Sequence, residues 1–253
     1  MSNVIDPSNQ PSYLANLKKY DDSVERQYMR PALIKVIQYL SGPPFKPPFK
    51  DLDIIVTGNP MIKIGDAETP FEFTPILFFP TFGIKNPGKL KGQVRKYQEI
   101  DYDPDGIIAR KARNFVKEPY APKPEYSINY VQMLNFILLI HGYPDLKDKP
   151  IAYSVDVGEF NTGQMLLDLR ASRNAPPYVC RFRAHSAEHT AKDGNKWYGL
   201  NFNNAPEPWV TEEEASVYEK LHEQVKETVR LRQIDIDYEE GAGGESPANE
   251  TKF

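Results

Sequence analysis

The spacing of apolar and polar residues predicts a chain made mostly of short β-strands. In residues 29–41 the apolar positions fit either a strand or a helix, and we favour a strand. Residues 51–65 are typical of two strands joined by a Gly-Asn-Pro turn. Residues 71–85 are strongly aromatic, and Pro75 and Pro80 indicate an edge strand or a bulged strand.

The second half of the chain contains three further strand-like runs, at residues 149–160, 163–173 and 178–202. The middle run is ambiguous and is also compatible with a helix. The last run contains Lys-Asp-Gly-Asn, which predicts a hairpin turn. Its alternation places Arg181 and Arg183 on one face of a strand and Cys180 and Phe182 on the other.

One internal segment, residues 124–144, predicts a helix. It contains a long apolar run, Ser127 is a candidate N-cap, and Gly142 and Pro144 supply a stop signal.

A second helix is predicted over residues 210–233. Thr211 and Glu214 form a capping box at its start. An apolar stripe along it consists of Tyr218, Leu221, Val225 and Val229.

Composition agrees with a β-rich fold. The 253 residues include 23 prolines and 12% aromatic side chains, and proline disfavours both helix interiors and central strands. The single cysteine, Cys180, excludes an internal disulfide and a cysteine-based zinc site. His185 and His189 are close in sequence, but no third ligand is near, so we expect no metal site.

The sequence suggests neither export nor membrane insertion. The N-terminus lacks the basic and apolar regions of a signal peptide, and residues 1–28 read as a loosely ordered extension. The longest apolar run, residues 133–140, is too short to span a bilayer. We therefore expect a cytoplasmic protein with no membrane partner.

No motif indicates catalysis. The phosphate-binding glycine loops, the Gly-x-Ser-x-Gly elbow and His-Glu-x-x-His do not occur. Residues 101–106 resemble the start of a calcium loop but lack its terminal glutamate, so turn formation is the better account. We expect a non-enzymatic protein without a cofactor.

Basic residues gather between Lys85 and Lys117, although the net charge of the chain is -4. The aromatic residues Phe82, Tyr102 and Tyr120 are interleaved with them. Single-stranded nucleic acid requires this mixture, because cations follow the phosphates and rings stack on unpaired bases. The plainer alternative is a solvated loop. The predicted phosphate contacts are Lys85, Lys89, Lys91, Arg95, Lys96, Arg110, Lys111, Arg113, Arg181 and Arg183, and the stacking candidates are Tyr97, Phe115 and Trp197.

The C-terminal residues have the opposite charge. After Ile234 the chain is acidic and rich in Gly, Ser and Asn, which predicts disorder. Such a tail could occupy the cationic groove until nucleic acid displaces it, while Lys252 and Phe253 bind a partner protein. The alternative is an extension that only keeps the protein in solution.

The general plan resembles phage and bacterial single-stranded-DNA-binding proteins, which combine an OB-type barrel, a basic aromatic groove and an acidic tail ending in Phe. In addition, the order of three phrases is similar to that in a group of phage replication-associated proteins; the phrases are Arg-Pro-Ala-Leu-Ile-Lys-Val-Ile-Gln at 30–38, Arg-Asn-Ala-Pro-Pro-Tyr at 173–178 and Asn-Lys-Trp-Tyr at 195–198. Residues 101–126 depart from the pattern, because they lengthen a barrel loop.

The resemblance implies a mostly β fold: an OB-like antiparallel barrel with long inserted loops, one internal helix, a C-terminal helix and a disordered acidic tail. The expected divisions are residues 1–28, 29–209, 210–233 and 234–253. The implied function is sequence-independent binding of single-stranded DNA in phage DNA replication or recombination, with replication or transcription proteins recruited by the tail. Two alternatives remain: a strand-annealing recombinase, and a structural or host-interaction protein that binds no nucleic acid.

Overall fold

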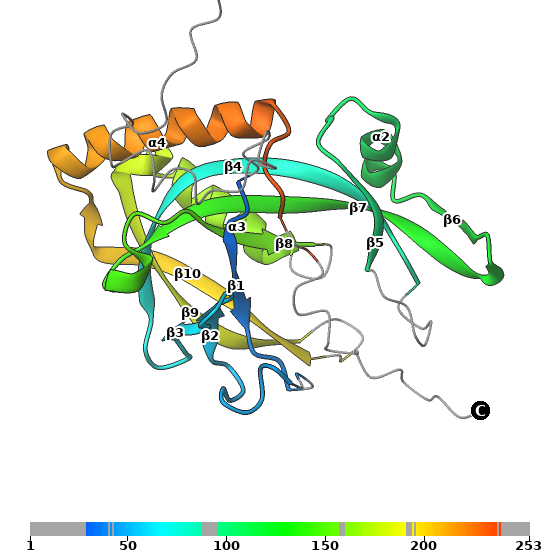
Figure 1. Ribbon diagram of the computed structural model, residues 1–253, viewed down its shortest axis with the longest axis horizontal. Helices are drawn as coiled ribbons and strands as arrows, with labels where there is room; N and C mark the ends of the chain where they lie inside the picture. The colour runs from blue at the N-terminus through cyan, green and yellow to red at the C-terminus, as the bar shows by residue number, and fades with distance from the viewer. Residues whose placement is uncertain are drawn as a thin grey trace, which may run out of the picture.

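The computed structural model describes residues 29–39, 41, 43–87, 96–156, 160–190, 194, 196–236 and 238. Within these residues the protein is mostly β, with a 10-stranded sheet that curls into half a barrel and carries helices on both faces (Figure 1). The strands are β1 (Ala32–Val36), β2 (Ile54–Val56), β3 (Ile62–Gly65), β4 (Phe71–Lys85), β5 (Tyr97–Asp101), β6 (Lys117–Tyr120), β7 (Lys123–Ile140), β8 (Ile151–Val155), β9 (Cys180–Thr190) and β10 (Lys196–Trp209).

The helices are α2 (Ile107–Arg113), α3 (Phe160–Ala171) and α4 (Glu212–Arg230), and short 3-10 turns occur at Pro144–Leu146 and Pro177–Val179. The strand order is β10-β9-β4-β7-β8-β1-β2-β3, with β5 added beside β4 and β6 beside β7. The paired strands are antiparallel, apart from the parallel pair β1–β8. The chain segments read as strands in residues 29–65 and 178–202 are confirmed.

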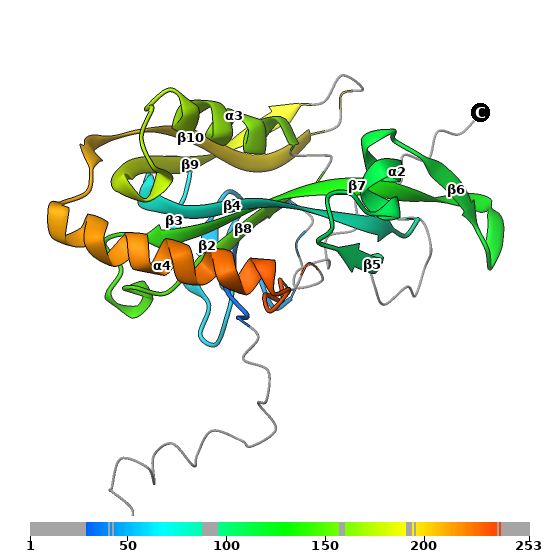
Figure 2. The same cartoon turned by 90° about the horizontal axis from the view of Figure 1, so that it is seen from above.

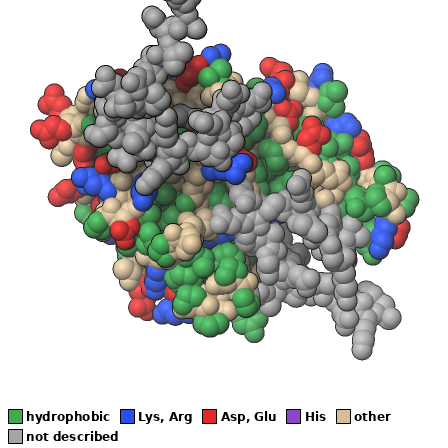
Figure 3. Space-filling view, viewed as in Figure 1, with side chains coloured by type: hydrophobic (Ala, Val, Ile, Leu, Met, Phe, Trp, Pro, Cys, Tyr) green, Lys and Arg blue, Asp and Glu red, His purple; other side chains and the backbone are tan. Residues whose placement is uncertain are grey.

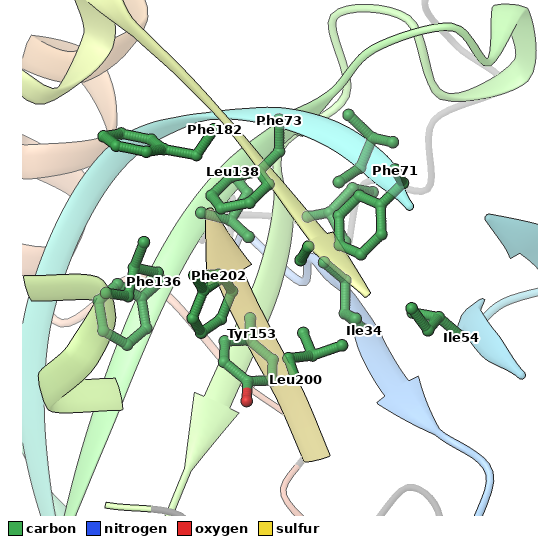
Figure 4. Packing of buried hydrophobic residues seen from close by; sticks show 14 of the residues in the cluster. Ile34, Ile54, Phe71, Phe73, Phe136, Leu138, Tyr153, Phe182, Leu200 and Phe202 are labelled. Carbon is green, nitrogen blue, oxygen red and sulfur yellow. The ribbon is translucent and has the colours of Figure 1, made fainter. Parts of the chain in front are cut away.

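The concave side of the curled sheet holds the main core. Phe73 is fully buried and contacts the rings of Phe71, Phe182 and Phe202. Figure 4 shows these rings converging from β4, β9 and β10 toward residues of β1 and β8. The curl of the sheet brings β1 near the end strand β10, where Gln38, just after β1, makes hydrogen bonds with the backbone of Tyr198.

Helix α3 packs on the concave side of the sheet, against β10, β7 and β8. Gly163 permits this approach, because a Cβ there would lie 2.7 Å from Val155 and 2.8 Å from Leu134. The reading of residues 163–173 as a strand was wrong. The run contains Gln, Met, Leu and Arg and no β-branched residue, and such a composition favours a helix.

Helix α4 covers the convex side of the sheet, which faces away from the main core (Figure 2). Its capping box is confirmed, because Thr211 accepts from the Glu214 backbone and Glu214 accepts from the Thr211 backbone. The predicted stripe packs against the sheet. Ile234 and Ile236 are buried in the same layer, so the start of the predicted acidic tail belongs to the folded part.

Residues 124–144 form most of strand β7, and the helix predicted there was wrong. The apolar run from Met133 to Ile140 is buried on both faces of the sheet, so it lacks the alternation that would identify a strand. Strand β4 is central and bulged between Pro75 and Leu77, so the bulge was predicted correctly and the edge position was not.

The far ends of β4 and β7 leave the curled body and extend outward together. We call this extension the arm, and it comprises residues 82–87 and 96–131 (Figures 1 and 2). Strand β5 pairs with β4, strand β6 pairs with β7, and α2 packs on one face through Ile108, Ala109 and Ala112. The first residues of β7 pair only with β6 and form a two-stranded ribbon.

Candidate nucleic-acid interface

The described members of the predicted interface fall into three separate groups. Lys85, Lys96 and Tyr97 lie at the root of the arm. Arg110, Lys111, Arg113 and Phe115 lie on and just after α2. Arg181, Arg183 and Trp197 lie on the hairpin of β9 and β10.

The group at the root of the arm surrounds one carboxylate. Asp156, which follows β8, accepts from the Nζ of Lys85 at 2.8 Å and from the hydroxyl of Tyr97 at 3.1 Å, and its Oδ2 lies 3.0 Å from the Nζ of Lys96. Tyr97 is buried, and Lys96 lies over its ring. Tyr97 is therefore a core residue, and the prediction that it stacks on bases was wrong.

The electrostatics of this group favour an ionised Asp156. Burial alone would raise the pKa of its carboxyl, but Lys96 and Lys85 outweigh burial and hold the pKa well below the ordinary value. The carboxylate thus compensates two of the cations that the sequence assigned to phosphates.

The hairpin group is also engaged within the protein. Arg181 donates two hydrogen bonds to Glu214 of α4, at 2.7 and 2.8 Å. The indole of Trp197 stacks on the ring of His189 with a centroid separation of 5.5 Å, so one of its faces is covered. Arg183 is half-buried and lies opposite Glu72 in the sheet register.

The hairpin group lies apart from the two groups on the arm. Strand β4 pairs with β9 up to Phe73 and with β5 from Phe82, positions about 30 Å apart along a strand. Figure 3 shows blue and red side chains intermixed on the face in view. The single continuous groove expected from the sequence is thus not present among the described residues.

The α2 group differs from the other two groups in how its cations are paired. Lys111 is held by Glu118 at 2.6 Å and by the Tyr130 hydroxyl at 3.1 Å. Arg113 donates to the carbonyl of Pro104 and lies 5.4 Å from the ring centroid of Phe82. Neither Arg110 nor Arg113 has a carboxylate within ion-pair distance in the described part of the chain.

Phe115 has a left-handed backbone conformation just after the C-terminal end of α2. Its φ is 52°, its N–H donates to the Ala112 carbonyl, and the next N–H, from Val116, donates to the Lys111 carbonyl. This pair of bonds is a Schellman motif, in which the left-handed position usually belongs to glycine. The side chain of Phe115 is 77% exposed, so the ring is presented to solvent.

Several predicted residues lie outside the described part of the chain. They are Lys89, Lys91 and Arg95 in the basic segment, and Lys252 and Phe253 at the C-terminus.

A buried polar network on the convex side was not predicted from the sequence. Asn135 donates to Thr81 and accepts from Ser154 and from the Tyr238 hydroxyl. Tyr238 also lies against Tyr97, with ring centroids 5.7 Å apart. Tyr238 therefore lies close to the Lys85–Lys96 group, through its contact with Tyr97.

A scan against family models and searches of curated proteins and of solved structures gave no match. No set of three or more His, Cys, Asp or Glu side chains suited to a metal occurs among the described residues. The Asp101 and Asp103 side chains accept from backbone N–H groups two residues ahead, which agrees with the turn predicted there. None of the helices that the structure describes is long and apolar enough to cross a membrane.

Proposed function

We propose that the protein binds single-stranded nucleic acid without sequence preference, and that the arm is its main contact surface. The observation that carries this proposal is the exposed ring of Phe115. A non-glycine residue in the left-handed region costs roughly 1–2 kcal/mol, and an exposed phenylalanine recovers little of that by packing. Backbone strain of this kind gathers at functional positions, which supports a binding role for the ring.

The surroundings of Phe115 support nucleic acid as the ligand. Arg110, Arg113 and Lys117 lie within five residues of it and are exposed. Lys123, also exposed, stands opposite Tyr120 in the ribbon. An aromatic ring among cations without acidic partners suits a strand whose bases are unpaired and whose phosphates are accessible.

The remaining parts of the proposal rest on the sequence. They are an OB-type identity, a role in phage DNA replication or recombination, a cytoplasmic location, and recruitment of replication or transcription proteins through Lys252 and Phe253. The position of Tyr238 beside Tyr97 is compatible with an acidic tail that competes for the basic segment. No catalytic step is part of the proposal.

The test is fluorescence anisotropy of labelled oligonucleotides, single-stranded and duplex, DNA and RNA, over a salt series. The wild-type protein should prefer single strands, and log K should fall linearly with log salt because phosphate contacts release counterions. Phe115→Ala should weaken binding roughly 10-fold, the loss of about one base stack.

Two matched controls accompany this test. Tyr39 is 74% exposed on the body of the sheet, so Tyr39→Ala removes a comparable ring and should leave affinity unchanged. Arg110→Glu should weaken binding, whereas Lys220→Glu on α4 should do so far less. Absence of wild-type binding at low salt, or equal affinities for Phe115→Ala and Tyr39→Ala, would refute the proposal. Gel filtration with DNA separates simple binding from a ring-forming annealing protein.

A further inference from the structure

A second feature of the arm is an open pocket of about 410 Å³ at the base of the ribbon. Its volume falls in the roughly 300–1,000 Å³ range of small-molecule sites. The residues that line it are Asn86, Gln98, Pro119, Tyr120, Ala121, Pro122 and Ile128. Figure 3 shows apolar side chains gathered over this end of the arm.

The walls of the pocket suit a flat, polar-edged ring. Tyr120 and the two prolines offer aromatic and apolar surfaces, and Ile128 is buried beneath them. Two carboxamides supply the polar side, where Gln98 Nε2 donates to Asn86 Oδ1 at 2.6 Å. A carboxamide has two donors and one acceptor, so this shared bond uses only part of the capacity of Gln98. Unpaired bases are recognised by ring stacking together with hydrogen bonds to their edges.

Charged residues of both signs lie near the pocket. Asn86 directly follows Lys85, and its N–H donates to the carbonyl of Lys96 at 2.9 Å. Lys123 stands opposite Tyr120 in the register of the ribbon. Glu118, a nearby carboxylate, is held by Lys111 and by the hydroxyl of Tyr130. Of these cations, Lys123 is exposed and stands beside Tyr120, so it is the one best placed to meet a phosphate attached to a ring in this pocket.

The pocket is also close to Phe115 along the chain. Tyr120 is five positions after Phe115, which places their Cα atoms at most about 18 Å apart. One flexible strand could therefore touch both.

We propose that this pocket takes one unpaired nucleobase of the bound strand, stacked on Tyr120 and hydrogen-bonded by Gln98. This inference rests on the proposed single-strand binding, and it adds a discrete base site to it. If this site exists, one nucleotide position of the bound strand should show a preference among the bases, and the other positions should show none.

The experiment uses full-length protein and oligo-dT strands that carry a single 2-aminopurine at successive positions. Anisotropy reports binding, and 2-aminopurine fluorescence reports stacking on an aromatic ring. The wild-type protein should quench the probe strongly at one position and weakly elsewhere. Tyr120→Ala should abolish that quenching and weaken binding roughly 10-fold.

Two further variants make the result specific. Gln98 is exposed, so Gln98→Ala should fold normally and reduce the difference in affinity between oligo-dT and oligo-dA. Tyr126 lies on the same ribbon outside the pocket, and Tyr126→Ala should keep the quenching. Strand binding with unchanged quenching in Tyr120→Ala would overturn the base site and leave the proposed function standing. Absence of strand binding by the wild type would overturn both.

Discussion

The curled body of the sheet and the arm bury their side chains to different degrees. In the body, the concave face encloses a core of aromatic rings, and the convex face is covered by α4 and by Ile234 and Ile236. In the arm, the ribbon is only two strands wide, and Phe115 and Ile107 remain exposed. A two-stranded ribbon is marginal alone, so the arm depends on the body for its stability.

The pairing of charged side chains also differs between the body and the arm. Arg181 in the body is matched by Glu214, and Lys85 and Lys96 at the junction are matched by Asp156. Arg110 and Arg113 on the arm have no such partner among the described residues. The described cations of the body and the junction are thus more fully paired than Arg110 and Arg113, and the proposed function assigns these two arginines to phosphate contacts.

The largest expected effect comes from the body core. Phe73→Ala should lower the free energy of unfolding by about 3–5 kcal/mol, because it leaves a cavity among three aromatic neighbours. Urea unfolding followed by circular dichroism measures this, with Phe115→Ala as the exposed control. A loss below about 1 kcal/mol would contradict the view that the body is the stable unit.

The free energy of unfolding should also depend on pH, through His141 in the body. His141 accepts or donates one hydrogen bond with Thr74 at 2.8 Å, and burial, followed by the charge of Arg181, lowers its pKa to about 4. Glu214 opposes that shift, and the ring of Tyr218 lies nearby. The unfolded chain binds a proton near pH 6.5 and the folded protein does not, so stability should fall as the pH falls from about 6.5 to about 4.

The size of this loss should be on the order of 2 kcal/mol, because the ring is partly exposed and solvent screens part of the effect. His141→Gln should flatten the profile in that window. Unfolding midpoints measured at several pH values test this. Parallel profiles for the two proteins would show that another group is responsible.

A smaller effect is expected at the junction of body and arm. Asp156→Asn removes the carboxylate that compensates Lys85 and Lys96, and should cost about 1–2 kcal/mol because the lysines are partly exposed. The same change should strengthen binding of single strands at low salt and steepen the salt dependence. Unchanged affinity would show that these lysines lie outside the path of the strand.

The parts of the fold that were predictable depend on local signals. The capping box and stripe of α4 lie within one segment, so they could be recognised directly. Strand β7 could not, because its run of buried residues reflects contacts on both faces of a sheet assembled from distant segments. The segment of α3 was left ambiguous between strand and helix, because its apolar spacing fits both, although its lack of β-branched residues favours a helix.

The sequence indicated which types of residue belong to the candidate site, but it did not show which of their side chains are exposed. Tyr97 and Phe115 both follow basic residues closely, yet one is buried against Asp156 and the other is exposed. The pairing of Asp156 with Lys85 joins positions far apart in the sequence, which no local pattern reveals. Phe115 gained its significance from a backbone angle that only the folded structure provides.

We expect the smallest effect on stability at Phe115. This change also gives the sharpest test of the difference between the body and the arm. Phe115→Gly should raise the free energy of unfolding by about 0.5–1 kcal/mol, because glycine adopts the left-handed position without steric cost. Binding of single strands should weaken as it does for Phe115→Ala. Thermal unfolding and anisotropy on the same samples measure both quantities. A variant that is more stable and binds more weakly would mean that the phenylalanine is retained for its ligand; a variant that is less stable would mean that the ring supports the fold of the arm.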